Sequence, residues 1–178
     1  SFSNGSTTGK VSFTMPSATK GGETLSGNIN YKVYLGDQKK EGTAAAGKTV
    51  QLDATLPEGR CKIVVTTSNA KGESERAATS LWIGKDAPAT VSGLSLKRTL
   101  DKGLQLRWDA VSTGAHNGYV DPASVTYKVV RQPDAKTVSE STTATVLYDN
   151  VESGELAKYW YEVTPSAYGK SGETLASN

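Results

Sequence analysis

Apolar and polar residues alternate along most of this chain in short runs, and the apolar positions do not gather at the spacing of an amphipathic helix. The runs are rich in Val, Ile, Leu, Thr and Tyr, which favour strands, and Gly, Asp, Asn and Pro separate them. Alternation with a period of two places one face of each strand toward an apolar interior and the other toward solvent. The pattern therefore predicts an all-β protein.

The same order of runs occurs twice, at a period of about 96 residues. The corresponding runs are 9–13 and 103–108, 29–34 and 125–130, and 61–66 and 159–164. Each is short and bounded by turn residues, and further short β-prone runs lie between them. Such spacing predicts about seven strands in each half.

A break in the alternation divides the two halves at residues 84–88, where Pro88 also removes a backbone donor. We expect one domain at 1–84, with its first strand clipped, and a second domain at 85–178. Trp82 lies just before the break. Two readings of Trp82 are open: the ring packs at the domain junction, or it covers its own sheet.

Alternation assigns a separate set of inward-facing side chains to each half, and each set is large enough to fill one core between two sheets. We expect these side chains to carry the packing, because the chain has one cysteine and no internal disulfide. The predicted core residues are Phe13, Tyr31, Val33, Ile63 and Val65 in the first half, and Trp108, Tyr127, Val129, Tyr159, Tyr161 and Val163 in the second.

Several of these positions resemble those of the fibronectin type III family. Pro88 matches the family's early proline, Trp108 its second-strand tryptophan and Tyr127 its third-strand tyrosine. In the first half, Asn69 and the turn at 72–74 are similar to the end of the family's sixth strand. The resemblance covers nearly the whole chain. It implies two tandem immunoglobulin-like (fibronectin type III) β-sandwiches.

The first half departs from the family at two positions. Phe13 replaces the tryptophan, and Cys61 replaces the tyrosine whose hydroxyl bonds to the backbone, so we expect this half to be the less stable copy. The inserts at 16–28 and 111–124 are similar to those of fibronectin-like modules in surface proteins of gut-type Bacteroidetes. This similarity implies a secreted or cell-surface bacterial protein, with an extracellular or cell-surface location.

Charge and cysteine usage narrow the function classes. Lys and Arg number 20 against 18 Asp and Glu, and the two signs are interspersed, so we expect no nucleic-acid partner. The apolar runs are far shorter than the roughly 20 residues that cross a bilayer, so we expect no membrane segment. Zinc-binding arrays of cysteine and histidine are missing from the sequence, and we expect no cofactor.

The sequence offers little material for catalysis. His116 is the one histidine, it lies in a polar loop, and Asp121 is the only close acidic residue, which is too little for a metal site. Cys61 lies on an alternating strand, where we expect a buried, unreactive thiol. No nucleophile with a base and no carboxylate pair can be recognised. We therefore expect no catalytic, metal or cofactor-binding residue in this chain, although a larger parent protein can be an enzyme.

Exposed aromatic rings are the remaining candidates for binding. Tyr119, Trp160 and Tyr168 are expected in loops or on an outer strand face, where they either stack on a ligand such as a saccharide or cover the apolar rim of their own domain. We expect a monomeric, non-catalytic spacer or adhesion segment, with the flanking domains of its parent protein, an extracellular protein or a glycan as partners. The alternative is an accessory carbohydrate- or protein-binding module of an extracellular hydrolase or protease.

Overall fold

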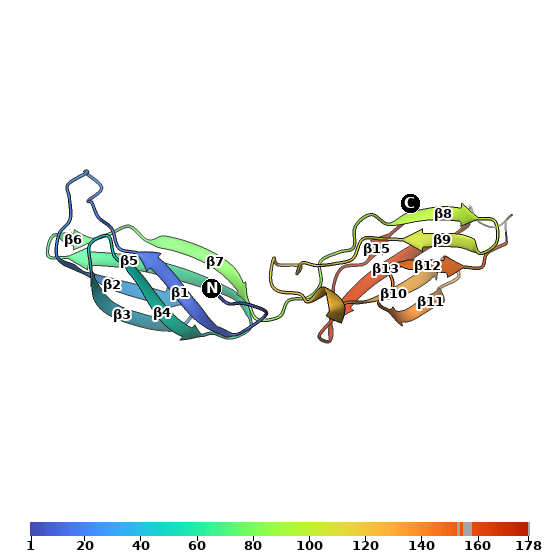
Figure 1. Cartoon of the computed structure of the whole chain (residues 1–178), viewed down its shortest axis with the longest axis horizontal. Coiled ribbons are helices and arrows are strands. Elements are labelled where there is room, and N and C mark those ends of the chain that lie inside the picture. The colour runs from blue at the N-terminus through green and yellow to red at the C-terminus, as the bar shows by residue number, and fades with distance from the viewer. Residues whose placement is uncertain (153, 155–157, 178) are drawn as a thin grey trace. The chain divides into compact units, whose positions relative to one another are not determined.

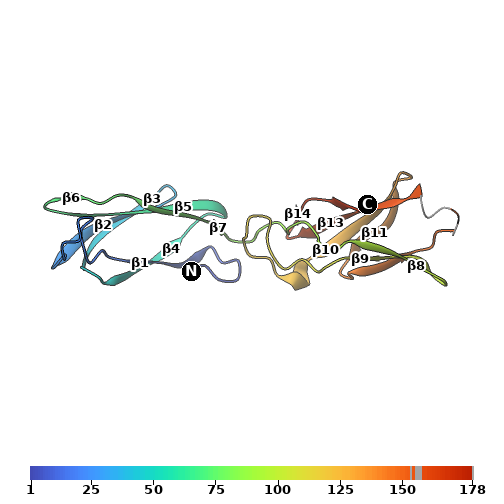
Figure 2. The ribbon, with the colours of Figure 1, turned by 90° about the horizontal axis from the view of Figure 1, so that it is seen from above.

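The structure is a computed structural model that describes residues 1–152, 154 and 158–177. The chain divides into two compact units, Ser1–Gly84 and Lys85–Asn178, which we call unit 1 and unit 2. Each unit is built of β-strands in two layers (Figures 1 and 2). The all-β, two-sandwich prediction is confirmed. Within the described residues, no helix has the length and apolar character that crossing a membrane requires.

Unit 1 contains two sheets. Its strands are β1 (Thr8–Thr14), β2 (Asn28–Leu35), β3 (Gln38–Ala45), β4 (Thr49–Thr55), β5 (Gly59–Asn69), β6 (Gly72–Glu73) and β7 (Ala77–Ile83). One layer is the antiparallel pair β1–β4. In the other layer the order is β3–β2–β5, and β5 also pairs with β6 and β7.

The β2–β3 hairpin shows how the local sequence sets the register. Leu35 pairs with Gln38, so Gly36 and Asp37 form a two-residue turn. Gly36 adopts φ +59, which a side chain would disfavour, and glycine at the first turn position is typical of a tight hairpin that matches the strand twist. This register carries Val33 and Leu35 to the inner face, where both are buried.

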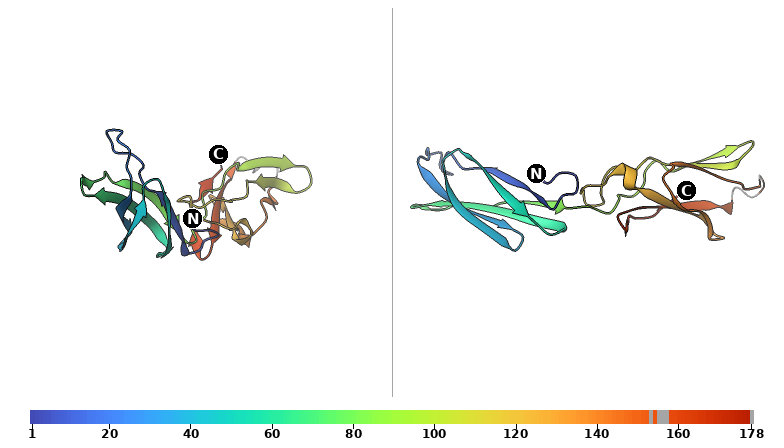
Figure 3. Two further views of the ribbon diagram at one scale, coloured as in Figure 1. Left: turned by 60° about the vertical axis from the view of Figure 1, so that its left-hand side comes forward. Right: turned by 60° about the horizontal axis from the view of Figure 1, so that its bottom comes forward.

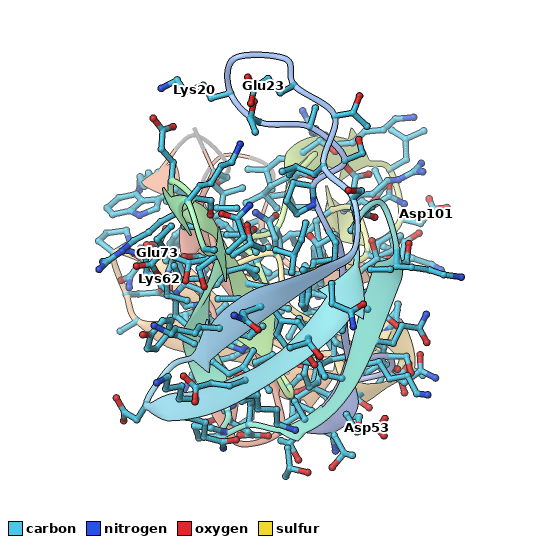
Figure 4. All side chains as sticks on the ribbon, turned by 90° about the vertical axis from the view of Figure 1, so that its left-hand side faces the viewer. Lys20, Glu23, Asp53, Lys62, Glu73 and Asp101 are labelled. Carbon is cyan, nitrogen blue, oxygen red and sulfur yellow. The ribbon has the colours of Figure 1, made fainter. Side chains whose placement is uncertain are left out.

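The core of unit 1 lies between its two layers. Val33 and Ile63 are buried, and Phe13, Tyr31 and Val65 are partly buried and pack against the same cluster. The rings of Phe13 and Tyr31 meet edge to face at 5.3 Å between centroids. The loop between β1 and β2 extends away from these layers, with Lys20 and Glu23 at its tip (Figure 4).

Unit 2 repeats the arrangement. Its elements are β8 (Ser95–Thr99), β9 (Gly103–Arg107), a 3-10 turn η1 (Pro122–Ser124), β10 (Thr126–Gln132), β11 (Lys136–Thr142), β12 (Val146–Asp149), β13 (Trp160–Ala167), β14 (Lys170–Ser171) and β15 (Leu175–Ala176). One layer has the order β12–β9–β8. The other has the order β11–β10–β13, and β13 also pairs with β14 and β15. Figure 3 shows the strands of this unit, in yellow to red, from two further sides.

The core of unit 2 contains an aromatic pair that corresponds to the pair of unit 1. Trp108 and Tyr127 are both buried, and their rings meet edge to face at 5.4 Å, as Phe13 and Tyr31 do in unit 1. The Tyr127 hydroxyl also accepts a hydrogen bond of 2.9 Å from the backbone N–H of Val111. Val129, Tyr161 and Val163 are fully buried, whereas Tyr159 is partly buried at the edge of the cluster.

The two units differ at one edge of the smaller layer. In unit 2, β8 pairs along the whole of β9. In unit 1 the corresponding side of β1 is bonded through Lys10 to Ser1: the backbone N–H of Lys10 donates to the Ser1 carbonyl at 3.1 Å, and the Ser1 ammonium donates to the Lys10 carbonyl. Figures 1 and 2 show the amino terminus beside β1.

Candidate functional site

The structure brings two of the three candidate aromatic residues together. Lys85 forms a parallel bridge with Tyr119, and the Lys85 ammonium lies 4.6 Å from the centroid of the Tyr168 ring. Tyr119 is 36% exposed, whereas Tyr168 is partly buried and packs against the core. The Tyr168 hydroxyl accepts a hydrogen bond of 2.8 Å from the backbone N–H of Asp121. The ring and the hydroxyl of Tyr168 therefore both contact its own unit.

Trp160 lies apart from this pair. It is the first residue of β13 and 40% exposed, while Tyr168 directly follows the last residue of the same strand. At about 3.3 Å per residue, the two positions are roughly 26 Å apart along the strand. The three rings therefore do not form one stacking platform.

Two further exposed tyrosines were not singled out from the sequence. Tyr148 is 44% exposed on β12, with the Lys102 ammonium 4.9 Å from its ring centroid, and its hydroxyl accepts a hydrogen bond of 2.7 Å from the Gln105 side chain. Tyr34 on β2 is 38% exposed, and Lys39 lies 6.0 Å from its ring. Their outward positions follow from alternation, since each stands next to a more deeply buried leucine.

A hydrogen-bonded polar centre lies at the start of unit 2, around the fully buried side chain of Asp86. Its Oδ2 accepts hydrogen bonds from the backbone N–H groups of His116 at 2.7 Å and Gly118 at 3.1 Å. Its Oδ1 accepts from the Ala87 N–H at 2.8 Å and lies 2.9 Å from Nδ1 of His116. The sequence 84–88, expected as a linker, therefore contains an anchor of unit 2.

Burial raises the pKa of the Asp86 carboxyl, but the hydrogen bonds from the His116 ring and from the three backbone N–H groups outweigh it and hold the pKa below its usual value. Because an ionised carboxylate only accepts hydrogen bonds, the Nδ1 atom of His116 carries the proton in this contact. His116 is thus a half-exposed loop residue, as expected, but it also fastens its loop to Asp86.

A cavity of about 430 Å³ lies beside this centre, and His116, Thr90, Ser171 and Glu173 contribute to its lining. Asp121, the acidic residue expected near His116, faces η1 instead: its carboxylate accepts from the Ala123 N–H and the Ser124 hydroxyl. In the part of the chain that the structure describes, no three His, Cys, Asp or Glu side chains are grouped to hold a metal ion.

A second cavity, of about 450 Å³, lies in unit 1 between the β1–β2 loop and the β5–β6 turn. Leu25 and Ile29 provide apolar lining, and Lys20 and Glu75 form an ion pair of 2.5 Å at its side. Its volume lies within the range of small-ligand pockets, roughly 300–1,000 Å³.

Unit 2 also contains a buried ionic network that joins its two layers. Arg131 on β10 is 8% exposed, and its guanidinium donates to Oδ2 of Asp149 on β12 at 2.8 Å and to Asp134. Asp149 also accepts from the Tyr161 hydroxyl at 2.9 Å and from the Lys136 ammonium at 3.0 Å. Every carboxylate oxygen of Asp149 therefore has a charged or hydroxyl donor.

The network shifts the pKa values of its members. Burial raises the pKa of Asp149, and the hydrogen bonds from Lys136, Tyr161 and Arg131 outweigh it, so the pKa lies below its usual value. Burial and the Asp149 charge raise the pKa of Tyr161. The sequence carried one signal for this network, because Arg131 has the same strand parity as Tyr127 and Val129 and so points inward.

Cys61 is buried, and burial raises the pKa of its thiol. Because the thiolate is the reactive form, a raised pKa lowers the reactivity of this thiol. Its interior position agrees with the alternation of its strand.

The order of the strands defines the class of fold. In unit 2, β8, β9 and β12 form one layer, and β11, β10, β13 and β15 form the other. Unit 1 has β1 and β4 in one layer and β3, β2, β5 and β7 in the other. Antiparallel two-layer sandwiches of this order are fibronectin type III-like. The chain therefore contains two fibronectin type III-like β-sandwich domains in tandem.

Comparisons with known proteins find similar solved structures. The chain is similar to the FN1–FN3 domains of chicken CNTN1, with 16% identity and a TM-score of 0.35 over 94% of this chain and 62% of that one. It is also similar to a two-domain fibronectin type III segment from chicken tenascin, with 12% identity and a TM-score of 0.34 over 94% and 90% of the two chains. No family model and no curated protein matches the chain. The assignment of the class of fold therefore rests on the strand order and not on these TM-scores.

Proposed function

We propose that the chain is a non-catalytic pair of structural and interaction modules, a spacer or adhesion segment of a larger secreted or cell-surface protein, bacterial in origin. The observation that carries this proposal is the short connection between the two domains. Ile83 is fully buried in unit 1 and Asp86 is fully buried in unit 2, so Gly84 and Lys85 alone separate the two anchors. Three consecutive Cα–Cα steps span at most about 11 Å.

The hydrogen bonds of Asp86 support a spacer role, because they fix the first residues of unit 2 to its own loop. The backbone N–H of Asp86 also donates to the Tyr119 carbonyl at 3.0 Å, and the Ala115 N–H donates to the Ala87 carbonyl at 2.8 Å. Two residues, Gly84 and Lys85, therefore lie between the anchored ends. The proposed partners of such a spacer are the flanking domains of its parent protein.

The test compares the chain with a variant that has about ten Gly and Ser residues inserted between Gly84 and Lys85, a linker in the flexible regime. Small-angle X-ray scattering and distances between labels on the two units should give a narrow distribution for the chain and a broad one for the variant. A control carries the same insertion between Gly21 and Gly22, in a loop of unit 1, and should behave as the chain does. Equally broad distributions for the chain and the linker variant would contradict the proposal.

The alternative role is an accessory carbohydrate- or protein-binding module of an extracellular hydrolase or protease. The exposed rings of Tyr119 and Trp160 favour it, because aromatic faces stack on sugars and anchor protein interfaces. A glycan array would be probed with the chain, with Trp160→Ala and Tyr119→Ala, and with Tyr148→Ala as the matched control. Glycan binding that falls tenfold or more in the first two variants, and does not fall in the control, supports this role. An array on which the chain binds no glycan would contradict a carbohydrate-binding role.

A further inference from the structure

The outer face of the three-stranded layer of unit 2 carries side chains that the core does not use (Figure 1). Leu106 on β9 points inward and is buried, so Gln105 and Arg107 on either side of it point outward. Gln105 lies opposite Tyr148 on β12 and opposite Lys97 on β8. These three side chains therefore form one row across the layer.

A second row joins a cation to an exposed apolar side chain. Arg107 lies opposite Val146 on β12, and Val146 is 36% exposed. Lys102, in the turn that connects β8 to β9, places its ammonium 4.9 Å from the ring centroid of Tyr148. Cationic, aromatic and aliphatic groups thus adjoin one another. We call this surface the cationic face, and its members are Lys97, Lys102, Gln105, Arg107, Val146 and Tyr148.

The charge of the cationic face is unbalanced. Lys97, Lys102 and Arg107 are exposed, and none of them forms an ion pair with a residue that the structure describes. Two carboxylates lie at the ends of the layer: Asp101 is in the β8–β9 turn, and Asp109 follows β9 and accepts a hydrogen bond of 3.0 Å from a serine hydroxyl. Three exposed cations on one face attract an anionic partner, most strongly at low salt.

The corresponding face of unit 1 has a different character. On the β1–β4 layer Lys10 lies opposite Asp53, and their charged groups form an ion pair of 3.7 Å. Ser12 lies opposite Gln51, and the other outward positions of these two strands are threonines. Because unit 1 builds the same layer with balanced charge, the fold does not require a cationic face.

The hydrogen bonds of the cationic face leave it rich in donors. The Tyr148 hydroxyl accepts a hydrogen bond of 2.7 Å from Nε2 of Gln105, so its own proton remains to be donated to a partner. The Arg107 guanidinium has the geometry to hold both oxygens of one carboxylate. The Lys102 ammonium covers one face of the Tyr148 ring, and that face is then closed to a stacking sugar. These groups therefore favour a partner that carries carboxylates.

We propose that the cationic face binds an acidic polypeptide segment in which Asp or Glu alternates with apolar residues. Arg107 and Lys97 hold the carboxylates, and Val146 contacts an apolar side chain between them. Tyrosine and arginine are enriched at protein interfaces, and complementary charge selects the partner. This binding goes beyond the spacer role, which rests on the connection at Gly84 and Lys85, so either proposal can fail without the other.

The test titrates the full chain, at about 50 mM salt, with a labelled peptide of about twelve residues that repeats Glu-Val-Glu-Ser. Amide signals in nuclear magnetic resonance should shift at Gln105, Arg107 and Val146 and should stay in place at Lys10 and Ser12 of unit 1. Affinity should fall as salt is added, because ions screen exposed charges. A peptide that repeats Gln-Val-Gln-Ser should not bind, and one that repeats Glu-Ser-Glu-Ser should bind at least about threefold more weakly.

Matched variants test the residues of the face. Arg107→Gln should weaken binding of the Glu-Val-Glu-Ser peptide at least about fivefold, because a charged, bidentate contact is lost. Tyr148→Phe should weaken it about twofold or more, because it removes one donor. Lys10→Gln removes the same charge from the corresponding face of unit 1 and should change the affinity less than about twofold. Equal affinity of the chain and Arg107→Gln, or equal losses in Arg107→Gln and Lys10→Gln, overturns the proposal.

Results that give the face another occupant also overturn it. Equal binding of the Glu-Val-Glu-Ser and Glu-Ser-Glu-Ser peptides would mean that the face attracts negative charge of any kind. Heparin that binds more tightly than the peptide, and loses affinity in Arg107→Gln, would assign the face to an anionic polysaccharide. Vesicles containing phosphatidylserine that displace the peptide would assign it to a membrane surface.

Discussion

Trp108 and Phe13 occupy matching places in the two domains, yet their side chains differ in burial and in polar groups. The Trp108 ring is buried, and among the described residues its indole N–H has no hydrogen-bond partner. An unpaired buried donor costs about 1–3 kcal/mol, which the burial of a large ring offsets. Phe13 is more exposed and carries no such donor.

The first prediction follows from this difference. Trp108→Ala should lower the free energy of unfolding of unit 2 by about 3–5 kcal/mol, because it removes a large buried ring. Trp108→Phe should cost less than half of that, since the phenyl ring keeps the contact with Tyr127 and removes the unpaired N–H. Urea unfolding of the full chain, followed by probes in unit 2, measures both. Equal losses in the two variants would show that the ring contact contributes little.

The buried network gives a second prediction. Asp149→Asn leaves the buried Arg131 guanidinium with a neutral partner on one side, and it should lower the free energy of unfolding of unit 2 by about 3 kcal/mol. The control is Glu140→Gln, which changes the exposed ion pair with Lys128 at 2.9 Å and should cost less than about 1 kcal/mol. Denaturant unfolding of both variants measures these losses. Similar small losses of unfolding free energy in the two variants would contradict a stabilising role of the network.

The pH dependence of stability is a third prediction. The pKa values of Asp86 and Asp149 are lowered in the folded chain, so the folded state binds fewer protons than the unfolded state near the ordinary aspartate pKa of about 3.9. Stability is then fully present above that pH and is lost as the pH falls below it. Unfolding measured from pH 7 to 2 should show this fall, and the double variant Asp86→Asn, Asp149→Asn should show a shallower one.

At the level of elements, the alternation of apolar and polar residues predicted the strands, because one face of each strand packs against a core. The clearest cases are β5 and β10, whose inward residues Ile63 and Val129 are buried where the pattern placed them. The anchor at Asp86 could not be predicted, because its partners at 116–118 lie thirty residues away along the chain. A carboxylate in a Gly- and Pro-containing stretch is typical of an exposed loop. In the structure, the Asp86 side chain is buried instead.

The loop that holds Asp86 gives a prediction at this scale. A side chain on Gly114 would collide with the Asp86 carboxylate, so Gly114→Ala should destabilise unit 2 by about 1–3 kcal/mol, the usual cost of overpacking. Hydrogen exchange at the Gly118 amide should become faster. Gly21→Ala is the control, because a side chain there has ordinary contacts with Thr19 only. No change in Gly114→Ala would mean that the loop adapts freely.

At the level of the whole molecule, the chain consists of two domains with separate cores. The cluster of unit 1 and that of unit 2 share no residue. The repeat in the sequence predicted this arrangement, since two similar sets of inward residues are expected to close two similar sandwiches. Of the three aromatic candidates, Tyr119 and Trp160 are exposed, and Tyr168 packs on its own unit, which is one of the two alternatives that the sequence left open. Which rings meet depends on loop paths that alternation does not determine.

The most direct test of two independent cores is residue-level hydrogen exchange on the full chain carrying Trp108→Ala, measured across a urea series. The amides of β9, β10 and β13 should lose protection at urea concentrations at which those of β1, β2 and β5 keep theirs. If the amides of both units lost protection together and to the same extent, the two halves would share one cooperative interior, and the independence of the two cores would be contradicted.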